Sequence, residues 1–178
     1  RMAWAADNRS LIVDRLDKDT KRRQLFYVYN VGSKSEQTIL ITEETDEKWQ
    51  APLSAIFEPN PKDPAQLFFG SERDAYNHLY LATLEPQPAV NVSDTNARVA
   101  EGGGGFSTNV KIEQLTKGNW QVEWAKWTAS GDELVYLSTE AGYATREFYS
   151  IYMPDKRPMK LEGPNPEGMR LSPQMSEG

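Results

Sequence analysis

The 178-residue sequence predicts an all-β fold. No stretch of ten or more residues places its apolar side chains at the i, i+3 and i+4 spacing of an amphipathic helix. The apolar residues instead form short runs rich in β-branched and aromatic types, and Gly, Pro, Asn and Asp separate these runs. The same order of runs also recurs along the chain, which indicates a structural unit that occurs more than once.

Nine apolar runs are the candidate strands, each about three to seven residues long. In chain order they cover residues 11–13, 25–31, 38–42, 67–69, 79–84, 110–115, 122–127, 134–137 and 148–153. Turn-forming sequences separate them, for example at residues 30–32, 59–64 and 130–132. Short strands with regular turn signals are typical of an antiparallel arrangement.

Three copies of the repeat can be aligned at their first turns. Trp4 and Trp127 each stand seven residues before the first leucine of the following run. The third copy runs from Phe57 to Leu67 and is longer by three residues. We therefore expect Trp4, Phe57 and Trp127 to occupy equivalent buried positions.

The later parts of the repeat also correspond. An aromatic strand follows each polar loop, and a fourth strand is expected at residues 39–42, 114–116 and 170–172. A Trp-Gln pair precedes the next first strand twice. The positions expected to form the blade motif, besides the three aligned aromatic residues, are Trp49, Trp120, Ser71, His78, Tyr80, Ser138 and Tyr149.

Four antiparallel strands per repeat at this period are the pattern of a β-propeller blade, which must stack on its neighbours to bury its faces. The sequence predicts a β-propeller fragment of about three blades, at residues 1–48, 49–118 and 119–178. Because closed propellers have at least four blades, we expect an arc of a larger ring. Such an arc would expose a sheet face at each end, near Trp4 and Phe148, and this predicts association of the fragment with another copy.

Residues 86–108 do not fit the repeat and are interpreted as an insertion between the third and fourth strands of the middle blade. Pro, Asn, Ser, Asp and Thr dominate them, together with four consecutive glycines at 102–105. A phosphate-binding loop would need Gly-Lys-Ser/Thr after the glycines, but Phe106 follows them instead. The composition favours a mobile excursion.

Composition excludes several classes of function. The formal net charge is −6, from 20 Lys and Arg against 26 Asp and Glu, which argues against a nucleic-acid partner. No apolar run exceeds five residues, whereas a transmembrane helix needs ~20. Cysteine is absent, so disulfides, thiolate metal sites and Cys nucleophiles are excluded. The sequence starts at Arg1 without a recognisable signal peptide, and we expect an excised piece of a longer protein.

Four segments together resemble a known family. Residues 71–81 read SERDAYNHLYL, residues 115–122 read LTKGNWQV, residues 138–151 begin with STE and end with REFYSI, and residues 169–173 read MRLSP. In order and spacing they resemble the N-terminal β-propeller of dipeptidyl peptidase IV and its bacterial relatives, in the prolyl oligopeptidase clan. Ala75 stands where that family usually has Gly.

This resemblance implies an eight-bladed propeller that caps a C-terminal α/β-hydrolase domain and filters access for peptides. The whole enzyme would then be a serine exopeptidase that removes dipeptides from N-termini, usually after Pro or Ala. The resemblance also suggests a periplasmic, cell-surface or secreted location.

The catalytic parts of such an enzyme are not found in this sequence. No serine is flanked by glycines in the G-x-S-x-G pattern of a nucleophile elbow. The single histidine, His78, has no adjacent Ser or Asp in a triad-like arrangement, so we interpret it as structural. We expect no catalytic residue, no cofactor and no metal site, since no Ca²⁺-loop pattern is present either.

Two charged segments are interpreted as solvent-exposed. The Glu43–Glu44 pair lacks the aromatic context in which the family binds a substrate amino terminus, and it is read as a turn between blades. The basic stretch at 18–23 is read as a solvated hairpin tip. The alternative to a peptidase propeller is a non-catalytic propeller module that binds a protein or glycan partner.

Overall fold

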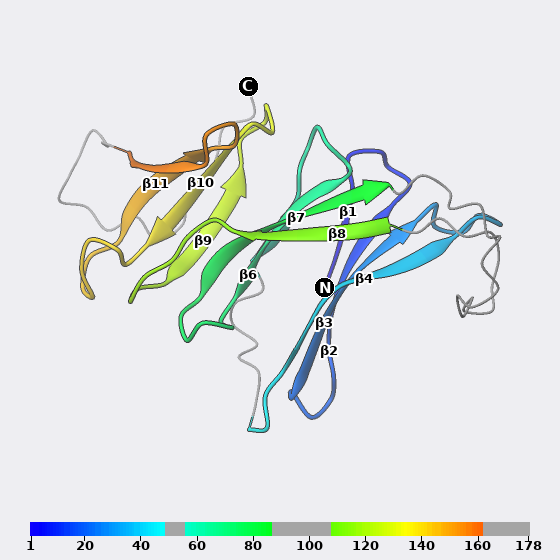
Figure 1. The fold of residues 1–178 in the computed structure, drawn as a ribbon, viewed down its shortest axis with the longest axis horizontal. Coiled ribbons are helices and arrows are strands. Elements are labelled where there is room, and N and C mark those ends of the chain that lie inside the picture. Colours follow the sequence, from blue (N-terminus) through cyan, green and yellow to red (C-terminus); the bar gives the residue numbers. More distant parts are fainter. Residues whose placement is uncertain (49–55, 87–107, 162–178) are drawn as a thin grey trace.

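The computed structural model describes residues 1–48, 56–86 and 108–161, and Figure 1 draws the remaining residues as a grey trace. All regular secondary structure in the described residues is β-strand, which confirms the all-β prediction there. No helix in these ranges is long and apolar enough to cross a membrane. Trp49, the loop after it, the glycine run and the strand expected at 170–172 lie outside the described residues.

The strands form three four-stranded antiparallel sheets, each with its strands in chain order. The first sheet contains β1 (Met2–Trp4), β2 (Leu11–Leu16), β3 (Arg22–Tyr29) and β4 (Gln37–Thr45). The second contains β5 (Phe57–Pro59), β6 (Gln66–Ser71), β7 (His78–Pro86) and β8 (Thr108–Gln114). The third contains β9 (Val122–Trp127), β10 (Glu133–Ser138), β11 (Glu147–Tyr152) and β12 (Arg157–Lys160).

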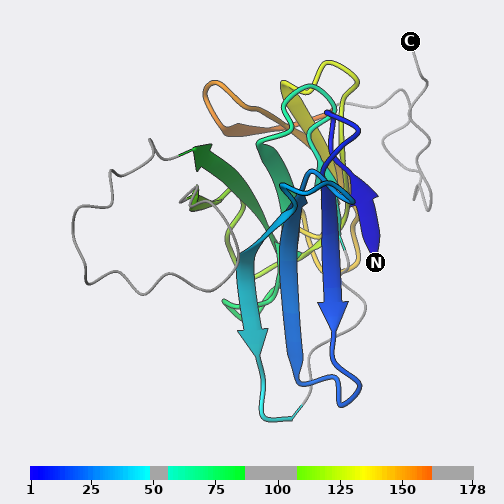
Figure 2. The same ribbon diagram turned by 90° about the vertical axis from the view of Figure 1, so that its right-hand side faces the viewer.

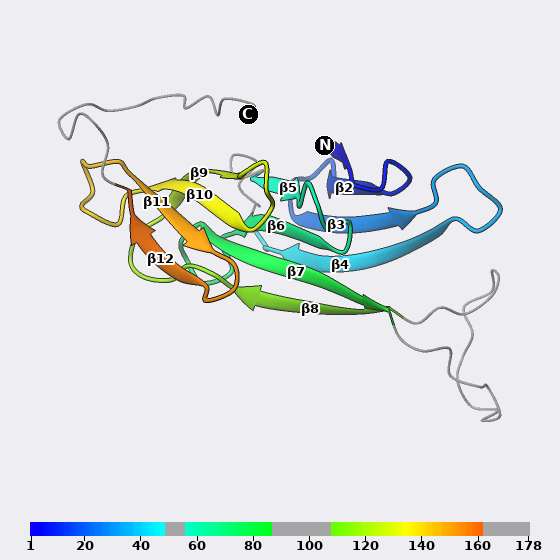
Figure 3. The same ribbon diagram turned by 90° about the horizontal axis from the view of Figure 1, so that it is seen from above.

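The three sheets stand one behind another, with the second sheet between the other two (Figures 1 and 3). Figure 2 views the stack from the side of the first sheet. We call the packing between the first and second sheets the first seam, and that between the second and third sheets the second seam. This arrangement is consistent with stacked propeller blades.

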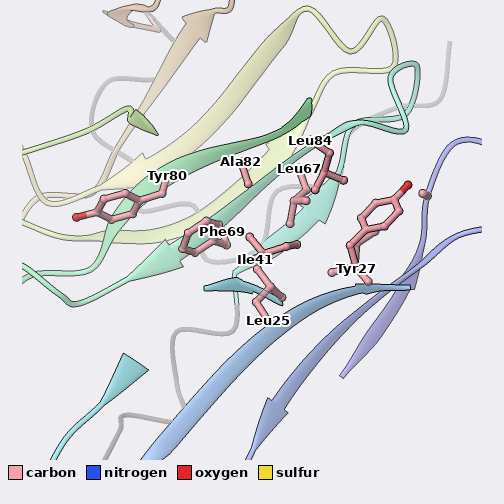
Figure 4. Close-up of a cluster of buried hydrophobic side chains, with 10 residues drawn as sticks. Leu25, Tyr27, Ile41, Leu67, Phe69, Tyr80, Ala82 and Leu84 are labelled. Atoms are coloured by element: carbon pink, nitrogen blue, oxygen red, sulfur yellow. The ribbon is translucent and has the colours of Figure 1, made fainter. Parts of the chain in front are cut away.

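The second sheet supplies apolar side chains to both seams because strand residues alternate between the two faces. Leu67 and Phe69 belong to the buried cluster of the first seam, whereas Phe68 belongs to that of the second. Figure 4 shows the first seam, where Leu25 and Ile41 of the first sheet meet Phe69 of the second. Five consecutive residues of β6 are therefore buried.

The structure corrects the alignment of the repeats. Trp4 pairs with Leu11 and Trp127 with Leu134, as their equal spacing predicts. In the second sheet, however, the residue opposite Leu67 is Pro59. The prediction that Phe57 is equivalent to the two tryptophans is wrong, because the second hairpin is only one residue longer than the others and Phe57 lies two residues upstream of the equivalent position.

Three further expectations differ from the structure. Trp4 is 56% exposed whereas Trp127 is 3% exposed, so the prediction that both are buried is wrong for Trp4. Trp127 packs on the second sheet, but Trp4 lies on the face of the first sheet that no described residue covers. The fourth strand of the second sheet ends at Gln114, before the expected residues 115–116. The third sheet has its fourth strand at Arg157–Lys160.

The first turns of the first and third sheets have the same geometry. The Ala5 N–H donates to Ser10 O, and the Thr128 N–H donates to Glu133 O, both at 2.9 Å. Asn8 and Gly131 then occupy the same turn position, with φ values of 53° and 75°. This left-handed conformation favours Gly or Asn over other residues.

Gly131 allows a test of the packing between hairpins. A Cβ atom there would lie 2.4 Å from Asn60 Oδ1 of the second sheet, whereas at Gly32, also at φ 75°, it would meet no atom within 4 Å. We expect Gly32→Ala to lower the free energy of unfolding by about 1 kcal/mol through backbone strain. We expect Gly131→Ala to lower it by about 1–3 kcal/mol more, because it also crowds the seam. Denaturant unfolding of both variants measures the difference, and equal losses would contradict the contact.

Candidate functional site at the seams between the sheets

Several buried polar residues of the described ranges lie at the two seams, among them Arg23, Ser71, His78 and Thr116. No group of three or more His, Asp or Glu side chains in the described ranges could hold a metal ion. The contacts of these residues join one sheet to the next.

A buried ion pair starts the polar network of the first seam. Arg23 Nε donates to Asp14 Oδ1 at 3.0 Å, and the two side chains are only 10% and 8% exposed. Arg23 Nη1 also donates to the Gly70 carbonyl of the second sheet at 2.7 Å. The guanidinium thus ties two strands of the first sheet to β6. The interpretation of residues 18–23 as a solvated tip is wrong for Arg23, because its side chain points into the seam.

Glu44 extends this network across the seam. Its Oε1 accepts hydrogen bonds from Ser71 Oγ at 2.6 Å and from Arg73 Nη2 at 2.8 Å, and its Oε2 lies 3.9 Å from Arg23 Nη1. The Glu44 side chain is 11% exposed and belongs to strand β4. Reading Glu44 as part of a solvated turn is therefore wrong. Only its neighbour Glu43 is exposed, since it lies on the opposite face of the strand.

Arg73 closes the network from the hairpin between β6 and β7. Besides Glu44 it bonds Ser71 Oγ through Nε at 2.9 Å, and its guanidinium carbon stands 4.5 Å from the centre of the Tyr80 ring. The two arginines and the two carboxylates make the network neutral. Such buried charges stabilise a fold only when every charge is paired, and here each has a partner.

His78 is the corresponding polar residue of the second seam. It is fully buried, with Nδ1 3.1 Å from Thr116 Oγ1 and Nε2 3.0 Å from the Gly118 carbonyl. Because that carbonyl can only accept, Nε2 carries a proton. Thr116 Oγ1 also accepts from the Leu79 N–H at 2.9 Å. His78 therefore fastens β7 to the segment before β9.

Aromatic rings fill the second seam beside His78. Trp120 stands edge-on to the His78 ring at 4.9 Å and stacks on Tyr136 at 6.4 Å, and Tyr136 stacks on Tyr149 at 5.4 Å. Burial raises the pKa of both tyrosine hydroxyls, and the nearby Glu140 carboxylate adds to this effect. These phenols are therefore neutral and act as packing groups.

Glu58 joins β5 and β9, the first strands of the two sheets that meet at the second seam. Its Oε2 accepts from the Trp127 backbone N–H at 2.9 Å, and its carbonyl accepts from Trp127 Nε1 at 3.2 Å. Burial raises the pKa of the Glu58 carboxyl, although the Trp127 N–H and the charge of Lys126 oppose the rise. Near the same hairpins, Asn60 Nδ2 donates to the Gly131 carbonyl at 2.7 Å.

The blade-motif residues have different roles. Ser71, His78, Tyr80, Tyr149 and Trp127 lie in the seams, and Trp120 is half-buried there. Ser138 is buried and accepts from the Glu140 N–H at 3.4 Å. Sequence reasoning missed Glu44, Glu58 and Asn60. The only sequence feature that could have pointed to them is that each is a polar residue within or beside a strand with apolar residues.

Comparison with known proteins decides the family. The family model described as the dipeptidyl peptidase IV (DPP IV) N-terminal region matches residues 1–177. The chain belongs to this family. Its fold is also similar to the crystal structure of a protein provisionally described as a dipeptidyl aminopeptidase IV from Bacteroides ovatus ATCC 8483, with 25% sequence identity and a TM-score of 0.59. That match covers 89% of this chain and 21% of the Bacteroides chain, so the chain spans about a fifth of the length of that protein.

Glu44 and Glu43 give matched variants for the first seam of this DPP IV N-terminal region. We expect Glu44→Gln to lower the free energy of unfolding by about 1–3 kcal/mol, because Arg23 and Arg73 lose a charged partner. The loss stays below that of a fully buried pair because Arg73 is 33% exposed. Glu43→Gln should change stability little, since Glu43 is exposed. Thermal and denaturant unfolding measure both, and equal effects would contradict the network.

Glu58 predicts a specific pH dependence. Because its folded pKa is raised, the folded protein holds this proton more tightly than the unfolded chain does. The protonated Glu58 carboxyl therefore contributes to stability. This contribution is fully present below the ordinary carboxyl pKa and is lost as the pH rises through the pKa of Glu58 in the folded protein. Glu58→Gln keeps an acceptor without a charge, so its stability relative to the parent protein should increase from pH 4 to pH 7.

The matched control is Glu58→Ala, which leaves the Trp127 N–H without its acceptor. It should lower the free energy of unfolding by about 1–3 kcal/mol at neutral pH. Unfolding curves at several pH values follow both variants. If Glu58→Gln loses stability relative to the parent as the pH rises, the raised pKa is refuted.

Proposed function

We propose that residues 1–48, 49–118 and 119–178 are three consecutive blades in the N-terminal β-propeller of a DPP IV-like serine exopeptidase. The observation that carries the proposal is the family match over residues 1–177, together with three stacked four-stranded sheets. A blade buries its faces only against neighbouring blades, and the second sheet is buried in this way on both faces.

In this proposal the propeller caps the catalytic domain and gates the access of peptides to it. The catalytic partner is a C-terminal α/β-hydrolase domain of the parent chain, and the substrate is a peptide with a free N-terminus. The three blades contribute no catalytic group. Support comes from the single histidine, whose two nitrogens are bonded inside the second seam, and from the lack of a nucleophile-elbow sequence.

The second candidate is a propeller module that binds a protein or glycan partner without chemistry. Exposed apolar side chains such as Tyr143, which is 84% exposed at a hairpin tip, favour a contact surface of some kind. The two candidates differ in one property, since only the first requires a hydrolase domain in the same protein.

The test uses the full-length protein that contains this chain. We expect it to release p-nitroaniline from Gly-Pro-p-nitroanilide, and an organophosphorus reagent should abolish this activity by modifying one serine. Peptide mass spectrometry should locate the modified serine outside residues 1–178. Modification of a serine within these residues would refute the non-catalytic role. A folded full-length protein that hydrolyses no dipeptide substrate would favour the binding module.

A further inference from the structure

Trp4 is the structural counterpart of Trp127 but lacks its environment. Both residues end the first strand of a sheet, pair with the leucine seven residues later and precede turns of the same geometry. Trp127 is 3% exposed and Trp4 is 56% exposed. The difference therefore does not arise within the hairpins.

Trp127 shows what this position does when a neighbouring sheet is present. Because Thr128 and Glu133 form the hydrogen-bonded pair next to it, the Trp127 N–H points away from β10, toward the open edge of the sheet. It donates there to the Glu58 carboxylate, while the indole N–H donates to the Glu58 carbonyl. The indole ring packs against Phe68 at 5.7 Å. One residue thus places two donors and a ring on the preceding sheet.

Trp4 has the same donors in the same orientation. Ala5 and Ser10 form the corresponding hydrogen-bonded pair, so the Trp4 N–H also points away from β2. Among the described residues, neither N–H group of Trp4 has an acceptor.

The face of the first sheet around Trp4 is apolar. By strand register, Met2, Leu11, Val13, Phe26, Val28 and Leu40 share this face with Trp4. Met2 is 70% exposed and Leu40 is 45% exposed. The second and third sheets use the corresponding faces to pack on the sheet that precedes each of them. The polarity of the repeat therefore assigns this face to a preceding sheet.

We propose that Trp4 docks onto a further β-sheet of the parent protein through a copy of the Glu58–Trp127 contact. The first strand of the docking sheet carries a Glu, Asp, Gln or Asn. The side chain of that residue accepts from the Trp4 backbone N–H, and its backbone carbonyl accepts from the Trp4 indole N–H. An apolar or aromatic side chain of the adjacent strand lies under the ring. This inference rests on the proposed propeller and names the chemistry of its next seam.

A further sheet of the parent protein fits this face better than a second copy of residues 1–178 does. At the second seam, the preceding sheet offers an acceptor beside the tryptophan position, namely Glu58. The third sheet of a second copy would bring Lys126 to that position, one residue before Trp127, and an ammonium group cannot accept a hydrogen bond. The matched Bacteroides chain is also about four times as long as this segment, because the same match covers 89% of this segment and 21% of that chain, so that protein has ample chain for a further sheet.

The experiment measures solvent access to Trp4 in the full-length protein. Hydrogen exchange followed by mass spectrometry should show slow exchange of the Trp4 backbone amide, comparable to that of Trp127. With 5-fluorotryptophan incorporated, the ¹⁹F resonance of Trp4, assigned with Trp4→Phe, should lack the H₂O/D₂O shift of an exposed indole. Trp127→Phe assigns the buried reference. Trp4→Phe keeps a ring but removes the indole donor, and it should lower the thermal midpoint.

Three outcomes would overturn the proposal. An amide of Trp4 that exchanges as fast as an unprotected one would show that no sheet covers it, and this result needs no variant. A full isotope shift at Trp4 would show an exposed indole. Protection that disappears on dilution would assign the face to a second copy. Peptidase activity of the same sample is measured in parallel, so that failure of this contact is distinguished from failure of the proposed function.

Discussion

The second sheet depends on burial of both of its faces. Five consecutive residues of β6 are buried, and they alternate between the two seams. One neighbouring sheet covers only one face of a four-stranded sheet. The second sheet therefore needs a neighbour on each side to bury both of its faces. The positions of the first and third sheets follow from this constraint, since each covers one face.

Polar contacts then determine how the sheets are aligned. Apolar packing alone is not directional and tolerates sliding of one sheet along another. The bonds of Arg23 to Gly70, of Arg73 to Glu44 and of Asn60 to Gly131 each join two particular strands or hairpins. Because unpaired buried charges and amides are costly, a displaced sheet would leave these groups without partners. Seams of this kind hold neighbouring sheets in one register.

The sequence predicted the all-β class correctly, but it predicted only some of the equivalent positions in the three repeats. Equal spacing from tryptophan to leucine placed Trp4 and Trp127 at the same register, and the structure bears this out. The second repeat has Pro59 at that position, and the nearby Phe57 led the alignment astray by two residues. An apolar side chain marks a strand face but does not mark its register, because alternate residues of one strand share a face.

The sequence by itself determined the all-β class, the repeated four-strand unit and the family, because these depend on local periodicity and on motifs close together in the chain. Only the tertiary structure decided that Glu44 and Arg23 are buried and that Trp4 is exposed. Their environments depend on residues of another sheet, as with Glu44 and Arg73, which lie 29 residues apart. Such contacts form only when the sheets stack. The order of charged residues along the sequence does not show which residues of another sheet a side chain will contact.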